Sequence, residues 1–356
     1  LVEGLERAEL LEIEASAGYL DAKVATFPDV KDQDYPGKGD EVGQQAMIRN
    51  LKELFQKYAQ ANGKISQELV RQIMEIEDLD GIMYRLHSSI VKNTSAKAAV
   101  DMAVYDLYAQ RFGAPLYQLL GGAGDTVETD ITISVNPVPQ MVADSLEAVQ
   151  QGYKILKIKV GKEGLADVAR IAGIRKAVGS GIQIRVDANQ GWTAKEAIRI
   201  ITAMEDKGLN IDLVEQPVPA HDLDGMRAVT KAVYTPILAD ESVFSPEDAA
   251  EIIRTRAADL LNIKLMKTGG IWQALKICSL AEMYGVECMI GCMLESKLAV
   301  SAAAHLAAAK RVITRADLDG PSLCKTDPFT GGPLYENGVI RMTDAPGIGI
   351  TRVPAF

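Results

Sequence analysis

The sequence predicts an α/β protein, a TIM-like (β/α)7β barrel with an α+β capping domain, and two observations carry this prediction. From about residue 128 onward, short β-rich runs recur every 24 to 29 residues, and each gap holds a stretch of helical composition. Parallel strands need a crossover that is usually a helix, so eight such units predict a parallel barrel ringed by helices. The length of 356 residues also suits one large barrel with an attachment.

Eight runs are expected to form the barrel strands. A polar turn and a stretch of Ala, Ile, Leu, Lys and Glu follow each β-rich run. In chain order the runs are ETDITISV (128–135), ILKIKV (155–160), IQIRVDAN (182–189), IDLVEQP (211–217), PILADES (236–242), LLNIKL (260–265), ECMIGCM (287–293) and RADLDG (315–320).

The segments on either side of the barrel are expected to form the cap. Residues 1–120 predict an α+β capping domain, with a strand over 9–16 and helices over 42–60 and 95–113. The barrel is expected over residues 121–325. Residues 326–356 form a tail that returns to the cap, because an Asn-Gly pair at 337–338 between two β runs predicts a hairpin there.

Composition and charge favour a small-molecule role. Lys and Arg number 38 against 48 Asp and Glu, a net charge of −10, which argues against nucleic acid or an anionic membrane as partner. No apolar run is long enough to span a bilayer, and four cysteines do not form a disulfide framework. We therefore expect a cytoplasmic protein. Only three histidines are present, so proton carriers and metal ligands are expected among Lys, Asp and Glu.

Two lysines end the second barrel strand. Lys157 and Lys159 stand two residues apart, so strand alternation places both ammonium groups on one face. Leu156 and Ile158 then face the helices, which leaves the lysines in the barrel lumen. Alone, such a pair is typical of a solvated surface strand, but the barrel context favours the lumen.

Three carboxylates end the next three strands. Asp187, Glu215 and Asp240 are separated by 28 and 25 residues, one strand-helix unit each. Singly, each is typical of a helix cap, but three carboxylates brought together repel one another unless a cation joins them. An all-oxygen site without His or Cys favours Mg²⁺ or Mn²⁺.

A third lysine, Lys264, ends the following strand in the row that faces the lumen, and Lys267 begins the next loop. Lys159 and Lys264 therefore flank the three carboxylate strands. Two lysines that face each other across a metal can remove a proton from one face of a carbon and return it to the other. A nearby cation and Lys157 are expected to lower the pKa of the base. Gly269-Gly270 opens a helix at which an anion can sit.

These motifs resemble those of a known family. KIKVG, VDANQGW, VEQP, ADESVF, NIKLMKTGGI and GCMLES, in this order and spacing, resemble the muconate-lactonising branch of the enolase superfamily, and within it the dipeptide epimerases most closely. NTSAKAAVDMAVYDLYAQ and PLYQLLGG also look like that group, so the resemblance covers about residues 93 to 350.

The resemblance implies an isomerase that epimerises the C-terminal residue of a dipeptide, with L-Ala-L/D-Glu favoured. It implies one Mg²⁺ per subunit on Asp187, Glu215 and Asp240, with Mn²⁺ as the alternative ion, and Lys159 and Lys264 as the two bases on opposite faces of the α-carbon. The substrate-binding residues that it implies are Thr132, Lys157, Cys292, Asp317 and Asp319.

Of these substrate-binding residues, Lys157 is expected to hold the substrate carboxylate. Asp317 and Asp319 point inward by strand alternation and are expected to hold the peptide's free amino terminus. Symmetric assemblies are common in the family, so a homo-oligomer is expected by analogy.

The sequence is also compatible with other functions. Cycloisomerases, N-acylamino acid racemases and o-succinylbenzoate synthases share the fold, and none of them needs Asp317 and Asp319 to bind an ammonium group. A Schiff-base aldolase with Lys264 as the covalent lysine is a second chemical class. A barrel that only binds a dipeptide or a cation is the non-enzymatic alternative, and it leaves Lys159 and Lys264 without a purpose.

Overall fold

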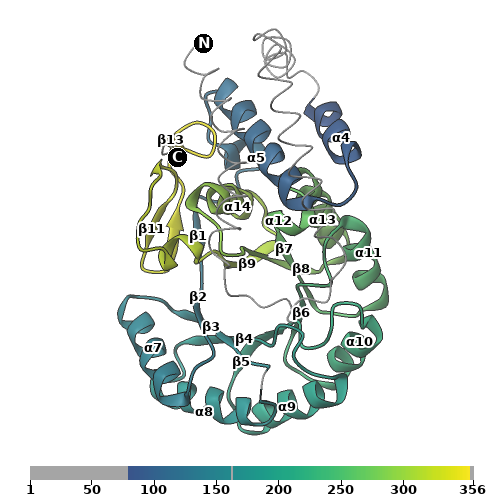
Figure 1. Cartoon of the computed structure of the whole chain (residues 1–356), viewed down its shortest axis with the longest axis vertical. Coiled ribbons are helices and arrows are strands. Elements are labelled where there is room, and N and C mark those ends of the chain that lie inside the picture. The colour runs from purple at the N-terminus through teal and green to yellow at the C-terminus, as the bar shows by residue number, and fades with distance from the viewer. Residues whose placement is uncertain (1–78, 162, 353–356) are drawn as a thin grey trace, which may run out of the picture. The chain divides into compact units, whose positions relative to one another are not determined.

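The computed structural model of the chain describes residues 79–161 and 163–352 (Figure 1). The chain divides into two compact units, Leu1–Ser88 with Ala355–Phe356, and Ser89–Pro354. Helix α4 (Leu79–Ser89) is the described element of the first unit. The strand expected over 9–16 and the helix expected over 42–60 lie outside the described residues.

Eight parallel strands form the barrel sheet in the order β2-β3-β4-β5-β6-β7-β8-β9, so neighbours in sequence are neighbours in the sheet. The strands are β2 (Ile131–Ile133), β3 (Ile155–Lys159), β4 (Gln183–Asp187), β5 (Ile211–Glu215), β6 (Ile237–Ala239), β7 (Leu260–Lys264), β8 (Glu287–Gly291) and β9 (Ile313–Asp317). Each overlaps one of the eight expected runs. The backbone N–H of Asp130 donates to the Ala316 oxygen at 3.3 Å and links the two ends of the sheet.

Helices connect the successive strands and lie on the outside of the sheet (Figure 1). They are α7 (Val138–Gln150), α8 (Ala166–Val178), α9 (Ala194–Asp206), α10 (Leu223–Ala232), α11 (Pro246–Thr255), α12 (Leu265–Thr268), α13 (Ile271–Tyr284) and α14 (Lys297–Ala309). The short α12 shares one connection with α13, so seven helical crossovers join eight strands. This confirms the expected (β/α)7β barrel for the described residues. None of the described helices is long and apolar enough to cross a membrane.

The strand faces follow the predicted alternation. Leu156 and Ile158 are fully buried on the side of β3 that faces the helices, and Lys157 and Lys159 take the alternate positions. Leu213, Leu238, Leu260 and Met289, from β5 to β8, pack into one buried cluster. Glu215, Asp240 and Asn262 each follow one of these leucines by two residues and so face the same side. The cluster therefore lies beneath a polar layer.

The remaining elements flank the barrel within the second unit. They are α5 (Thr94–Arg111), α6 (Leu116–Leu120), β1 (Thr126–Glu128), the 3-10 helix η1 (Gly320–Leu323), β10 (Thr330–Gly331), β11 (Leu334–Glu336), β12 (Val339–Arg341) and β13 (Ile350–Arg352). β11 and β12 form the predicted hairpin, and the turn residues Asn337 and Gly338 have φ of 53° and 76°. β12 then pairs antiparallel with β1. The backbone N–H of Ile348 donates to Asp106 of α5 at 2.7 Å, so the tail contacts α5.

Gly269 and Gly270 precede α13, and the anion expected at the start of this helix is a carboxylate of the same chain. Asp101, buried on α5, accepts hydrogen bonds from the backbone N–H groups of Ile271 at 2.6 Å and Trp272 at 3.2 Å. Gly270 has φ of +116°, and a Cβ there would lie 2.2 Å from Asp101 Cγ, so only glycine allows this close approach. The contact fastens α5 to the start of α13.

Candidate active site

The strand register places the candidate residues at one end of the barrel. Lys159 on β3 is paired with Asp187 on β4, and Asp187 is paired with Glu215 on β5. On the other side, Lys264 on β7 is paired with Gly291 on β8, and Gly291 with Asp317 on β9. Because all these strands are parallel, their C-terminal ends share one mouth, where polar side chains collect in such barrels.

Lys157 lies at the centre of this mouth and is 2% exposed. Its Nζ is 3.1 Å from Asp187 Oδ2, 2.7 Å from Glu215 Oε2 and 2.7 Å from Asp317 Oδ2. The ammonium group therefore joins the carboxylates predicted to bind a metal to one of those predicted to bind the substrate. These charges outweigh the effect of burial and hold the pKa of Lys157 well above its ordinary value.

Lys159 lies at the edge of the mouth, with 29% of its side chain exposed. Its Nζ is 2.7 Å from Asp187 Oδ2 and 3.0 Å from Asn189 Oδ1. The other Asp187 oxygen accepts a hydrogen bond from the backbone N–H of Asn189 at 2.9 Å. Asp187 thus fixes the orientation of the first predicted base from a fully buried position.

Lys264 faces the mouth from the opposite flank. Its Nζ lies 2.8 Å from Asp240 Oδ2, and the side chain is 8% exposed. Lys267 contacts the other Asp240 carboxylate oxygen and the Asp240 backbone oxygen, and its Nζ lies 3.1 Å from the backbone oxygen of Asn262. Asn262 in turn donates to Glu215 Oε1 at 2.9 Å. Each predicted metal ligand is therefore bound to a lysine amine.

The electrostatics of Asp187, Glu215 and Asp240, which we call the metal triad, follow from burial and from these amines. Burial, Asp187 and Asp240 raise the pKa of Glu215 to about 8, although Lys157 opposes them. Burial also raises the pKa of Asp240, but Lys264 and Lys267 outweigh it and hold that pKa well below its ordinary range. The lysines therefore outweigh burial and mutual repulsion at Asp240 but not at Glu215.

Neighbouring carboxylates oppose the expected lowering of the pKa of Lys264. Burial and Lys157 both lower that pKa, but Asp240, Glu215 and Asp317 raise it, and the net position is above the ordinary value. A neutral Lys264 therefore requires that the charge of its carboxylate neighbours be offset by another cation.

Among the described residues, the carboxylates whose ligand atoms approach one another closely enough for a metal ion are Asp130, Asp317 and Asp319, but the metal triad offers donors that suit a hard divalent cation. All three side chains are at most 2% exposed and offer only oxygen atoms, the donors that Mg²⁺ prefers. Glu215 Oε2 accepts no hydrogen bond of good geometry from the described residues, and its near neighbour is the Lys157 amine. An oxygen so placed has a lone pair available for a cation.

The predicted substrate-binding residues meet on the other side of Lys157. Asp317 and Asp319 are 4% and 5% exposed, and Asp319 Oδ2 accepts a hydrogen bond from the backbone N–H of Thr132 at 2.8 Å. The backbone N–H of Cys292 donates to the backbone oxygen of Asp317 at 3.0 Å. Burial raises the pKa of the Cys292 thiol well above its ordinary value, so this residue contributes an apolar wall, not a thiolate.

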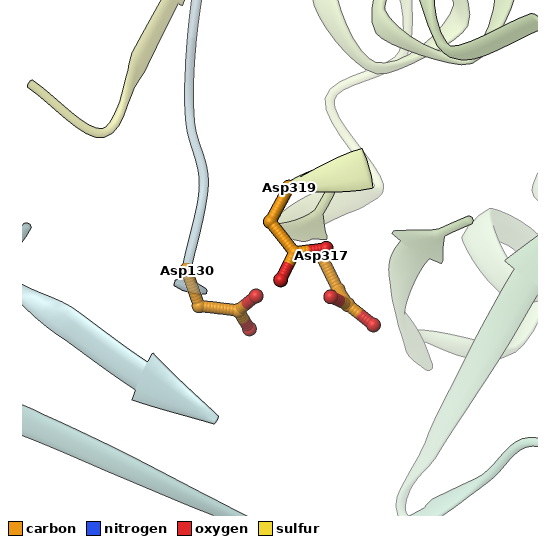
Figure 2. A group of neighbouring side chains, drawn as sticks. All are labelled: Asp130, Asp317 and Asp319. Atoms are coloured by element: carbon orange, nitrogen blue, oxygen red, sulfur yellow. The ribbon is translucent and has the colours of Figure 1, made fainter. Parts of the chain in front are cut away.

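Two further site residues were not predicted from the sequence. Asp130 joins Asp317 and Asp319 in a group whose ligand atoms all lie within 4.8 Å of one another (Figure 2). Strand alternation carried a signal for it, since Asp130 stands two residues before Thr132. Lys267 was assigned to a loop, but it lies in the helical turn α12 and is 5% exposed.

The barrel and its mouth of lysines and carboxylates define the class of protein, an α/β-barrel enzyme. Comparison with known families agrees with this. The family description "Enolase C-terminal domain-like" matches residues 140–354, and "Mandelate racemase / muconate lactonizing enzyme, N-terminal domain" matches residues 52–121. The chain belongs to the mandelate racemase and muconate-lactonising enzyme family of the enolase superfamily.

Its relatives are isomerases, as the resemblance implied. The chain is 59% identical over 293 residues to the L-Ala-D/L-Glu epimerase of Clostridium acetobutylicum, covering 82% of each. The substrate-liganded L-Ala-D/L-Glu epimerase of Bacillus subtilis is 55% identical, with a TM-score of 0.76 over 77% of this chain and 76% of that one. The dipeptide epimerase of Enterococcus faecalis, in complex with Mg and L-Leu-L-Tyr, is 46% identical, with a TM-score of 0.74 over 77% and 78%.

Proposed function

We propose that the chain is a magnesium-dependent epimerase that inverts the α-carbon of the C-terminal residue of a dipeptide, with L-Ala-L-Glu and L-Ala-D-Glu as the favoured pair. One observation carries the reaction type. Lys159 and Lys264 approach the metal triad from two flanks, on Asp187 at 2.7 Å and on Asp240 at 2.8 Å. The similarity to the L-Ala-D/L-Glu epimerases of Clostridium acetobutylicum and Bacillus subtilis supports the substrate class.

The two lysines divide the proton transfer between them. One lysine takes the α-proton from one face of the substrate carbon, and the other delivers a proton to the opposite face, which inverts the configuration. For the reverse reaction the two exchange roles. Each amine is positioned by a carboxylate that is itself at most 2% exposed, so neither swings freely.

The metal triad would hold one Mg²⁺, or Mn²⁺ as the alternative. When bound there, the ion supplies positive charge that offsets the negative charge developing on a substrate carboxylate beside the reacting carbon. The residues themselves exclude water from this point, because the triad and Lys157 are almost fully buried. Lys157 is proposed to hold the substrate carboxylate from the side that faces Asp317.

The substrate's amino terminus is proposed to bind Asp317 and Asp319, with Thr132 and Cys292 lining the same space. Asp319 is oriented by the Thr132 backbone, so a carboxylate is held ready without help from a ligand. This is the feature that favours a dipeptide with a free amino group over an N-acylated amino acid, which carries no ammonium group to bind.

A dipeptide library tests the function directly. The holoenzyme is incubated with Mg²⁺ in D₂O, and uptake of one deuterium at the C-terminal α-carbon is read as a mass shift. Uptake with L-Ala-L-Glu or a related dipeptide is expected, with loss of uptake in EDTA. Deuterium uptake confined to N-acylamino acids would support an N-acylamino acid racemase instead. Activity that survives EDTA and is trapped by borohydride would support an aldolase.

We propose a cytoplasmic enzyme that works on a small molecule without a nucleic-acid or membrane partner and that forms a homo-oligomer. The division into a cap over 1–120, a barrel over 121–325 and a tail over 326–356 stays a prediction. Size-exclusion chromatography with light scattering tests the oligomeric state.

A further inference from the structure

Buried carboxylates gather at the seam between the first and last barrel strands. Asp130 is fully buried, and its carboxylate points toward those of Asp317 and Asp319 (Figure 2). Asp317 and Asp319 already belong to the proposed ammonium site. Asp130 has no role assigned so far, although its ligand atom and those of Asp317 and Asp319 all lie within 4.8 Å of one another.

The two oxygens of Asp130 have different surroundings. Oδ2 accepts a hydrogen bond from Arg185 Nη1 at 2.8 Å. Oδ1 has no hydrogen-bond partner among the described residues, and it is buried. A buried carboxylate oxygen without a partner is costly, so Oδ1 requires either a proton or a cation beside it.

The local charges do not balance. Four charged groups face Asp130: Asp317 from β9, Asp319 after β9, Lys157 from β3 and Arg185 from β4. Lys157 is shared with Asp187 and Glu215, and Arg185 is shared with Asp212 at 3.1 Å. The carboxylates therefore outnumber the ammonium and guanidinium groups available to them, and burial makes that excess unfavourable.

A proton removes the excess. Two ionised carboxylates only accept hydrogen bonds, so Asp130 and Asp317 can bond to each other only if one of them is protonated. Burial and the neighbouring Asp317 hold the pKa of Asp130 well above its ordinary value, whereas Lys157 outweighs burial and lowers the pKa of Asp317 to about 2. The proton therefore resides on Asp130.

We infer that Asp130 is a third carboxylate of the ammonium site, and that the proton it shares with Asp317 in the free enzyme leaves for solvent when the substrate's ammonium group binds. The inference rests on the proposed function and deepens it. One positive charge replaces another, so the buried charge stays constant while Asp130 Oδ1 gains a cationic neighbour. Binding of a free-amino dipeptide then strengthens as pH rises, up to the point at which the amino group itself loses its proton.

The test counts protons during binding. The Mg²⁺-loaded enzyme is titrated by calorimetry, in buffers of different ionisation enthalpy, with an L-Ala-D/L-Glu mixture already at epimerisation equilibrium, so that no net turnover contributes heat. Wild type is expected to release about one proton per dipeptide near neutral pH. Asp130→Asn is expected to release almost none and to bind the dipeptide about tenfold more weakly. Asp212→Asn, which removes the other carboxylate partner of Arg185, is the matched control and is expected to behave as wild type.

A measurement on wild type alone tests the inference even if Asp130→Asn does not fold. Infrared difference spectra are expected to lose a protonated carboxyl band when the dipeptide binds and to keep it with N-acetyl-L-Ala-Glu. Equal proton release by wild type and Asp130→Asn, or an unchanged infrared band, would overturn the inference. So would a second Mg²⁺ per chain that Asp130→Asn removes. Absence of dipeptide binding and turnover in wild type would instead overturn the proposed function.

Discussion

Lys264 Nζ lies 2.8 Å from Asp240 Oδ2, where the adjacent strands β6 and β7 end at the mouth of the barrel. The contact joins a proposed base to a proposed metal ligand. Asp240 raises the pKa of Lys264 and opposes loss of its proton. A cation bound by Asp240 would weaken this effect, so binding of the ion and activation of the base are linked through one carboxylate.

The first prediction concerns the two bases. Lys159→Ala and Lys264→Ala are each expected to abolish epimerisation and to lose α-hydrogen exchange with one enantiomer of the C-terminal residue while keeping some exchange with the other. The reason is that each amine serves one face of the carbon. Exchange in D₂O, followed separately for L-Ala-L-Glu and L-Ala-D-Glu, measures this.

The control for the bases is Lys195→Ala, an exposed lysine of α9. It should leave exchange with both enantiomers unchanged. If Lys159→Ala and Lys264→Ala lost exchange with the same enantiomer, the two-base arrangement would be wrong.

The second prediction concerns Lys267, which contacts Asp240 and the Asn262 backbone at once. Two of its contacts are to backbone oxygens, so it ties the end of β6 to β7 and orients Asp240. Lys267→Met is expected to weaken Mg²⁺ binding about 10- to 100-fold, as loss of a residue that orients a metal ligand does. Calorimetric titration with Mg²⁺ alone measures this, and KM for the dipeptide at saturating Mg²⁺ should change little.

Lys276→Met on α13 is the matched control for Lys267, because it removes an exposed lysine from a neighbouring element. It should bind Mg²⁺ as wild type does. Tighter Mg²⁺ binding by Lys267→Met would show that Lys267 acts as a charge that competes with the cation, not as a positioning residue.

The sequence predicted the barrel because its signals are local and repeated. Each strand, turn and helix is encoded within one unit, and the period of two along a strand already separates Leu156 from Lys157. The site could be predicted for the same reason, because the C-terminal residues of parallel strands lie together at one end of the barrel. Asp187 and Glu215 are indeed paired in register.

Contacts between distant parts of the chain could not be predicted in this way. Lys157 reaches Asp317, 160 residues away, and which carboxylate an amine meets depends on side-chain packing across the lumen. Asp101 fills the anion site at the start of α13 from 170 residues earlier in the chain. Lys267 was misassigned because one short helical turn, α12, decides whether it points into the barrel or into solvent.

The third prediction concerns Mg²⁺ and stability. A ligand that binds only the folded state raises the free energy of unfolding, by about 2.7 kcal/mol at 100 times its Kd. Mg²⁺ is therefore expected to raise the melting temperature of wild type, and Glu215→Gln is expected to lose most of this effect because it removes a charged ligand. Differential scanning calorimetry with and without EDTA measures it.

The control is Glu287→Gln, at the exposed start of β8, which should respond to Mg²⁺ as wild type does. A normal response from Glu215→Gln would exclude Glu215 as a ligand.

The fourth prediction concerns acid stability and His305, which is 1% exposed on α14 and accepts a hydrogen bond from the Tyr117 backbone N–H at 3.1 Å. Burial lowers the pKa of His305 to about 4, so the folded protein keeps it neutral while the unfolded chain takes up a proton below its ordinary pKa. Stability is therefore lost as pH falls from 6.5 toward 4, and the loss from this residue between pH 7 and pH 5 is about 2 kcal/mol. His305→Asn keeps an acceptor for Tyr117 but cannot be protonated. Between pH 7 and pH 5, its free energy of unfolding in urea is therefore expected to fall by about 2 kcal/mol less than that of wild type. His221→Asn, at an exposed position, should follow wild type, and an equal loss in all three proteins would show that other groups govern acid unfolding.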